Sequence, residues 1–119
     1  MAVSEEFSEY LLELFEPLED VAIKRMFGGV GVFCHGVMFG LIASDRLYFK
    51  IDDENKPMFE EAGCAPFTYR GKNGRRGVMS YYEAPDFLYD DSEEMLTWAR
   101  SALDAALRKD KAKNSKRRR

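Results

Sequence analysis

The sequence predicts a two-layer α+β domain, with a five-stranded antiparallel sheet that carries its helices mainly on one face. Apolar residues recur at helical spacing near both ends of the chain, and short apolar runs separated by tight-turn signals lie between them. Short turns imply antiparallel pairing, because parallel neighbours need a longer crossover. A chain of 119 residues is long enough for one domain with a single core. The expected order of elements is α-βββ-α-ββ-α.

The first helix is predicted by an apolar stripe near the N-terminus. Ser4 is placed to cap it, and Glu5 and Glu6 follow in the first turn, where the helix dipole favours acidic side chains. Pro17 disfavours a helical conformation at the residue before it, so we expect the helix to end near Phe15. The stripe recurs with the period of one helical face, in Phe7, Tyr10, Leu11, Leu14, Phe15 and Leu18.

Three strands are expected next, over residues 30–33, 37–43 and 46–51. His35-Gly36 and Ser44-Asp45 are typical of the tight turns that would join them. In the third strand apolar residues alternate with polar or aromatic ones, which is the pattern of a strand with one buried face. We interpret the glycines before residue 30 as a break ahead of the first strand. They do not suggest a phosphate-binding loop, because such loops lead into a helix.

A short helix and two more strands follow. Residues 52–55 supply N-cap chemistry for the helix, and Gly63 is a natural C-terminal stop. The strands are expected over 67–70 and 78–83, joined by a polar, glycine-rich loop over 71–77. These two strands bring the predicted sheet to five.

The last helix is predicted to begin at Asp91 or Ser92, and Glu94 completes a capping-box-like pair with Asp91. No apolar periodicity remains after Arg108. We therefore expect the domain to span residues 1–107, and residues 108–119 to form a basic tail without regular structure. The apolar stripe of the helix comprises Met95, Trp98, Ala99, Ala102, Leu103 and Ala106.

Charge is divided unevenly between these two parts. The tail carries eight basic residues and one acid, so the rest of the chain holds ten of the 18 basic residues and 20 of the 21 acidic ones. A cationic tail can contact nucleic-acid phosphates without reading their sequence, or serve only as a solvated solubility tail. It can also contact acidic surface, on this chain or on a partner protein. Its basic residues are Arg108, Lys109, Lys111, Lys113, Lys116, Arg117, Arg118 and Arg119.

The composition is that of a soluble globular protein, and no apolar run approaches the roughly 20 residues that span a bilayer. The acidic N-terminus lacks the apolar core of a secretory signal, so we expect a cytoplasmic protein without membrane contact. Cys34 and Cys64 are too far apart for a CxxC pair or a zinc pattern, and we expect them to be unpaired thiols.

Few residues suggest catalysis. The single histidine, His35, lies in a predicted turn beside Cys34, and neighbours in a strand point to opposite faces, so we do not expect a nucleophilic pair. Acidic pairs lie mostly at predicted helix starts, where capping explains them. We therefore expect a non-enzymatic protein without catalytic residues, a metal site or a cofactor.

Four segments, taken in order, resemble one known family. They are Lys24-Arg25-Met26-Phe27-Gly28-Gly29, Leu47-Tyr48-Phe49-Lys50, Pro66-Phe67-Thr68-Tyr69 and Met79-Ser80-Tyr81-Tyr82-Glu83-Ala84-Pro85. Together they are similar to the N-terminal domain of the TfoX/Sxy competence regulators. The resemblance implies an α+β fold of the secretion-chaperone-like kind. It also implies a positive regulator of natural competence, since members with the full architecture are thought to work with the cyclic-AMP receptor protein at competence promoters.

Those members carry a second, helical domain after this one, whereas this chain ends in the charged tail, so the resemblance implies a stand-alone regulatory or interaction module. Two hypotheses follow. The first is a non-enzymatic regulator that acts in transcription through a protein partner, such as a transcription factor, with weak DNA contact through the tail. The second is a homodimeric protein-interaction or adaptor domain with no role in competence or DNA binding.

The expected partner-binding residues are Lys24, Arg25, Met26 and Phe27. A basic pair beside a methionine and an aromatic residue is common on partner-binding surfaces. A basic strand edge that faces solvent explains the same pair without a partner. The sequence therefore gives a candidate surface and leaves its use open.

Overall fold

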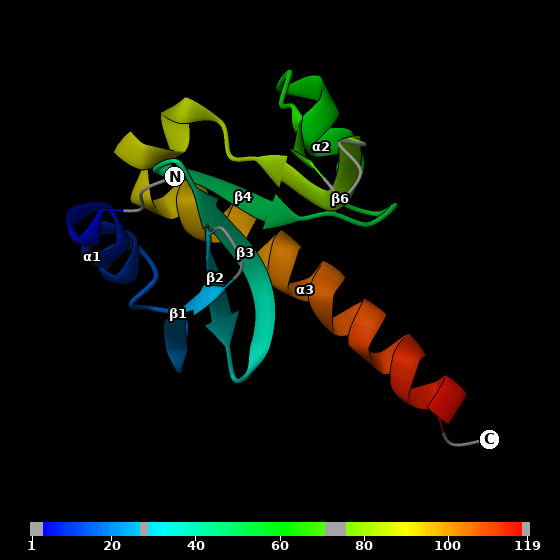
Figure 1. Cartoon of the computed structure of the whole chain (residues 1–119). Coiled ribbons are helices and arrows are strands. Elements are labelled where there is room, and N and C mark those ends of the chain that lie inside the picture. Colours follow the sequence, from blue (N-terminus) through cyan, green and yellow to red (C-terminus); the bar gives the residue numbers. More distant parts are fainter. Residues whose placement is uncertain (1–3, 27–28, 71–75, 118–119) are drawn as a thin grey trace.

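Helices and strands follow one another as an α+β fold in the computed structural model, which describes residues 4–26, 29–70 and 76–117 (Figure 1). The helices are α1 (Glu5–Leu14), α2 (Lys56–Glu61) and α3 (Ser92–Arg117), with the 3₁₀ helix η1 (Asp86–Asp90) just before α3. The strands are β1 (Val21–Met26), β2 (Gly29–Cys34), β3 (Val37–Ala43), β4 (Arg46–Lys50), β5 (Pro66–Arg70) and β6 (Arg76–Glu83).

The strands join one antiparallel sheet in the order β1-β2-β3-β4-β6-β5. The predicted α+β class and antiparallel pairing are confirmed, but the count of five strands is wrong by one. The additional strand is β1, which pairs with β2 from Val21↔Cys34 to Met26↔Gly29. Its exposed basic pair weakens the apolar alternation, and Gly29, predicted as part of a break ahead of the first strand, begins β2 and pairs with Met26 of β1.

Turns and chain reversals occur where the sequence predicts them. His35 and Gly36 have φ angles of 51° and 79°, and Ser44 and Asp45 have φ angles of 51° and 54°. Positive φ at both central residues is the type I′ geometry that suits two-residue hairpins. Gly63, with φ of 75°, follows the end of α2, in the conformation that glycine adopts most easily after a helix.

The predicted caps also define the ends of the helices. The Phe7 N–H donates to the Ser4 hydroxyl at 3.2 Å, and Phe15 is the C-cap of α1. The Glu94 N–H donates to the Asp91 carboxylate at 3.1 Å, so Asp91 caps the start of α3. These local contacts satisfy N–H groups that have no partner within the helix.

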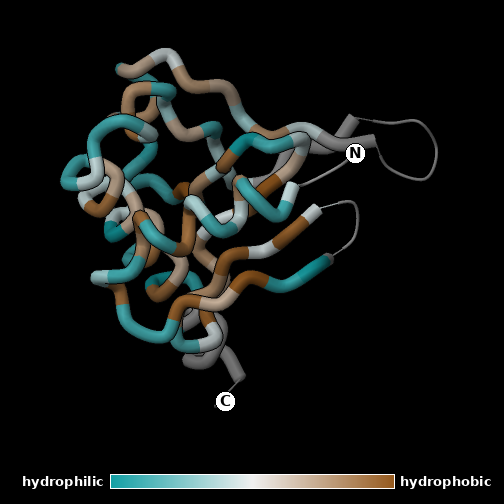
Figure 2. Tube along the Cα trace, turned by 90° about the vertical axis from the view of Figure 1, so that its left-hand side faces the viewer, coloured by the Kyte–Doolittle hydropathy of each residue, from teal (hydrophilic) through white to brown (hydrophobic). Residues whose placement is uncertain are grey.

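The core lies between one face of the sheet and the helices that pack against it. Aromatic rings form a continuous chain through it, with centroids 6.4 Å apart for Phe15 and Phe49, 6.2 Å for Phe49 and Phe59, and 4.7 Å for Phe59 and Trp98. These rings come from α1, β4, α2 and α3, so the core ties all three helices to the middle of the sheet. Figure 2 shows hydrophobic segments along the strands and hydrophilic ones over much of the outer chain.

Helix α3 is longer than expected and continues to Arg117. The prediction of a tail without regular structure from residue 108 is wrong for residues 108–117, because lysine, arginine and alanine propagate a helix that the packed turns have already started. Figure 1 shows this end of α3 projecting away from the sheet. None of the described helices combines the length and hydropathy that crossing a membrane requires.

Candidate functional site

Three of the four predicted partner-binding residues, Lys24, Arg25 and Met26, lie on β1, at one edge of the sheet. Within the described chain, β1 has β2 as a neighbour on one side and no strand on the other. Lys24 and Arg25 are both exposed, and adjacent strand residues point to opposite faces, so the two charges flank this edge. The Met26 side chain and Phe27 lie outside the described residues, and partner binding stays a prediction for all four residues.

The two basic side chains have different surroundings. The Lys24 Nζ lies 5.5 Å from the centroid of the Phe33 ring, which is a cation–π contact. Arg25 lines a hollow of about 240 Å³ between β1 and the exposed side of α1, together with the apolar side chains of Ile23 and Val30. Glu5 and Glu9 of α1 line the same hollow, so Arg25 shares it with two acidic side chains, although no described carboxylate lies within ion-pair distance of it.

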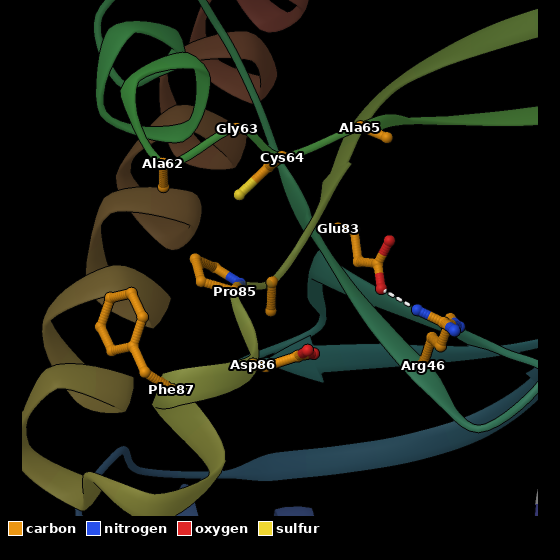
Figure 3. A pocket seen from close by; sticks show the side chains of 10 residues that line it. Arg46, Ala62, Gly63, Cys64, Ala65, Glu83, Pro85, Asp86 and Phe87 are labelled. Atoms are coloured by element: carbon orange, nitrogen blue, oxygen red, sulfur yellow. Dashed lines mark hydrogen bonds and ion pairs between the residues drawn. The ribbon is translucent and has the colours of Figure 1, made fainter.

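A second hollow, of about 500 Å³, lies between the end of α2 and the start of η1 (Figure 3). The half-exposed ring of Phe87 and the Arg46–Glu83 ion pair belong to its lining. Cys64 also faces it, and burial, followed by the carboxylates of Glu83 and Asp86, raises the pKa of this thiol. A protonated thiol is a poor nucleophile at neutral pH.

Both cysteines are unpaired, as predicted. Cys34 is buried and its thiol donates to the Glu19 carbonyl at 3.1 Å. Burial, and then the carboxylates of Asp20 and Glu19, raises the pKa of Cys34. His35 lies in an exposed turn with its Nδ1 3.5 Å from the Asp20 carboxylate. Across residues 4–26, 29–70 and 76–117, no three His, Cys, Asp or Glu side chains gather as metal ligands.

The first residue of the predicted basic tail is held against the body of the domain. The Arg108 Nε donates to Asp52 Oδ2 at 2.6 Å and its Nη2 donates to Asp52 Oδ1 at 2.9 Å, while Glu54 Oε2 lies 3.2 Å from the Nε. The Arg108 guanidinium, aided by backbone N–H donors, lowers the pKa of Asp52 to about 2. Arg108 therefore serves tertiary structure and is not a free cation.

The other basic residues of the predicted tail differ in their surroundings along α3. Lys109 lines a hollow that it shares with Lys50 of β4, and Lys111 is exposed. Lys113, Lys116 and Arg117 stand on the projecting end of α3 and their side chains lie outside the described residues, while Arg118 and Arg119 lie outside them entirely.

A family model described as the TfoX N-terminal domain matches residues 13–106, from the end of α1 through most of the packed part of α3. The chain belongs to this family. It is similar to the DNA transformation protein TfoX1 of Aliivibrio fischeri (strain ATCC 700601 / ES114), with 29% identity over 93 residues. The match covers 78% of this chain but 44% of that relative, so the chain spans less than half of the relative's length.

The TfoX N-terminal match includes the β1 edge and ends before Arg108, so the two candidate surfaces differ in their relation to the family. Besides β1 and the length of α3, sequence reasoning missed the burial of Lys50. Alternation along β4 marks Lys50 as outward-facing, yet its side chain is 7% exposed. Ala106 and Lys109 line the hollow beside it, and no local signal predicts that α3 lies there.

Proposed function

We propose that this TfoX N-terminal domain is a non-enzymatic regulatory module that binds a protein partner of the transcription apparatus through the free edge of β1. The observation that carries the proposal is the position of Lys24 and Arg25, two exposed cations on a strand with a single neighbour within the described chain. The name of its relative, a DNA transformation protein, supports a role related to competence. The role of that longer protein is carried over here as part of the proposal.

The chemistry of the edge suggests how a partner would bind. An edge strand presents backbone N–H and C=O groups in a row, so an extended segment of another chain can add to the sheet. Cations on both faces of β1 would favour acidic side chains on that segment and would oppose basic ones. The hollow beside Arg25 adds the apolar contacts of Ile23 and Val30.

Charge reversal at the edge tests this proposal. We expect the double variant Lys24→Glu, Arg25→Glu to lose an acidic partner that the unaltered chain captures from the source lysate, with at least about a tenfold drop in affinity once the partner is purified. Arg100→Glu is the matched control, because Arg100 is an exposed cation on α3. Equal capture by both variants would show that the partner binds elsewhere.

A contact between DNA and α3 is a second candidate function, and a specific observation favours it. The end of α3 that projects from the sheet carries Lys109, Lys111, Lys113, Lys116 and Arg117. A helix with this charge would bind phosphates without sequence preference, and the affinity would fall steeply with salt. Truncation after Lys109 should reduce the dependence of DNA affinity on salt, measured by fluorescence anisotropy, and an unchanged dependence would exclude α3.

The β1 edge also supports the alternative of a homodimeric adaptor. Two copies of β1 can pair in antiparallel fashion across a twofold axis, which would extend the sheet between subunits. Lys24 and Arg25 would then approach their own copies, and like charges oppose close pairing. Sedimentation equilibrium distinguishes the two, since a monomer at micromolar concentration leaves the edge free for another protein.

A further inference from the structure

A cationic hollow lies where α3 passes β4, and its lining reaches β2, where the Phe33 ring also contacts Lys24 of the β1 edge. It encloses about 530 Å³, a volume within the range of small-molecule pockets. Its basic lining groups are Lys50, Lys109 and His35, its other titratable group is the Tyr81 phenol, and its described lining includes no carboxylate. Apolar and aromatic side chains complete the wall, among them Phe33 and Tyr81.

Lys50 is the unusual member of this lining. Its side chain is 7% exposed, and a lysine this deeply buried normally has an anionic partner. No described carboxylate lies within ion-pair distance of it. Asp52 and Asp53 line the adjoining hollow that Lys50 and Lys109 share, but the Asp52 carboxylate binds Arg108. The ring of Tyr81, the cross-strand neighbour, also contacts Lys50, with its centroid 5.1 Å from the Nζ.

A second cation makes the lack of an anion more costly. Burial and the ammonium group of Lys109 lower the pKa of Lys50, while Asp52 acts in the opposite direction. Two ammonium groups brought together at a partly buried site repel each other unless a negative charge lies between them. Lys109 reaches this position because α3 continues beyond its apolar stripe, so the helix and β4 build the site together.

We propose that this hollow is an anion-binding site for a phosphate group, held between the ammonium groups of Lys50 and Lys109. A phosphate offers enough acceptor oxygens to take hydrogen bonds from both ammonium groups at once. The group arrives either as free phosphate or on a small phosphate monoester whose organic part lies against Phe33 and Met38. The site adjoins the β1 edge through Phe33, but it uses other charged residues and does not depend on the function proposed for that edge.

The test uses the full chain with two probes, inorganic phosphate and phenyl phosphate, in buffers of matched ionic strength. Binding is followed by isothermal titration and by the shift of the thermal midpoint. We expect both probes to bind saturably and to raise the midpoint, since a ligand that binds the folded state stabilises it. Tighter binding of phenyl phosphate would identify a monoester as the source, and equal binding would identify free phosphate.

Three variants assign the binding to the lysine pair. Lys50→Met keeps the length of the buried side chain and removes its charge, and we expect it to weaken binding by about tenfold or more. Lys109 is exposed, so Lys109→Gln should fold normally, and it tests the site even if Lys50→Met fails to fold. Lys111→Gln is the matched control, because Lys111 lies on the same helix outside this lining.

The outcomes divide clearly. Saturable binding that is weakened by Lys50→Met or Lys109→Gln and kept by Lys111→Gln supports the site. The proposal is wrong if neither probe binds at millimolar concentration. It is also wrong if Lys109→Gln binds as tightly as the unaltered chain, or if Lys111→Gln weakens binding as much as Lys109→Gln does, since general attraction to a basic helix would then explain the signal.

Discussion

The two halves of α3, which meet near Arg108, share one continuous backbone, yet they are stabilised in different ways. In the first half Met95, Ala99, Ala102 and Ala105 are fully buried against the sheet and the other helices. In the second half no apolar stripe continues and Lys111 is exposed. The first half is therefore stabilised by burial against residues that are distant in the chain. The second half depends on helix propensity and on propagation from the helix that the first half has already formed.

The largest expected effect comes from the packed half. Trp98 is 7% exposed and its ring makes edge contacts with Phe59 at 4.7 Å and with Phe87 at 5.9 Å. Trp98→Ala should lower the free energy of unfolding by about 3–5 kcal/mol, as large-to-small core substitutions do. Urea denaturation measures this, with Lys111→Ala as the control in the projecting half. A loss below about 1 kcal/mol would mean that the core does not hold this half.

An intermediate effect is expected at Asn55, a buried polar side chain that ties α3 to the end of β4. Its amide accepts from the Asp52 N–H at 2.8 Å and donates to the carbonyls of Lys50 at 2.9 Å and Ser101 at 3.3 Å. Asn55→Ala leaves these groups without their partner and should cost about 1–3 kcal/mol. Asp53→Ala, at an exposed neighbouring position, is the control for the same denaturation experiment. Equal stability of both variants would rule out the bridge.

A smaller effect belongs to the boundary between the two halves, where Arg108 binds Asp52. Both side chains are partly exposed, so at neutral pH Asp52→Asn should cost only about 1 kcal/mol. The pKa of Asp52 falls from 3.8 to about 2 in the folded chain. The stabilisation is thus complete above about pH 4 and is lost as the pH falls toward 2. Between pH 4 and pH 2 the free energy of unfolding should change less with pH in Asp52→Asn than in the unaltered chain. The same pH dependence in both proteins would contradict the ion pair.

The smallest effect is expected from removing the projecting half. A chain that ends after Lys109 keeps the Arg108 ion pair and all of the buried stripe. Its free energy of unfolding should change by less than about 0.5 kcal/mol, while its helical circular dichroism signal falls by the missing turns. A loss above about 1 kcal/mol would show that residues 110–119 contribute to the packed domain and would remove the contrast between the halves.

Features governed by neighbouring residues were predictable from the sequence. The cap at Ser4, the end of α1 near Phe15 and the type I′ turns at His35-Gly36 and Ser44-Asp45 depend on side chains and φ angles within a few positions. The family followed from short motifs, and the matched range of residues 13–106 confirms it. The α+β class followed from the helical spacing of apolar residues near both chain ends and from the alternation along the strands between them. Strand β1 was missed because its basic pair interrupts the apolar pattern.

By itself, then, the sequence determined the class of the fold, the family, the turns and most helix ends, because these depend on residues that are close along the chain. Only the tertiary structure decided that β1 is an edge strand, that Arg108 forms an ion pair with Asp52, and that Lys50 lies buried beside Lys109. Each of these depends on which strands pair and where α3 crosses the sheet. Such pairings join residues far apart in the chain, and their free energy comes from the burial of the whole core, which no local pattern records.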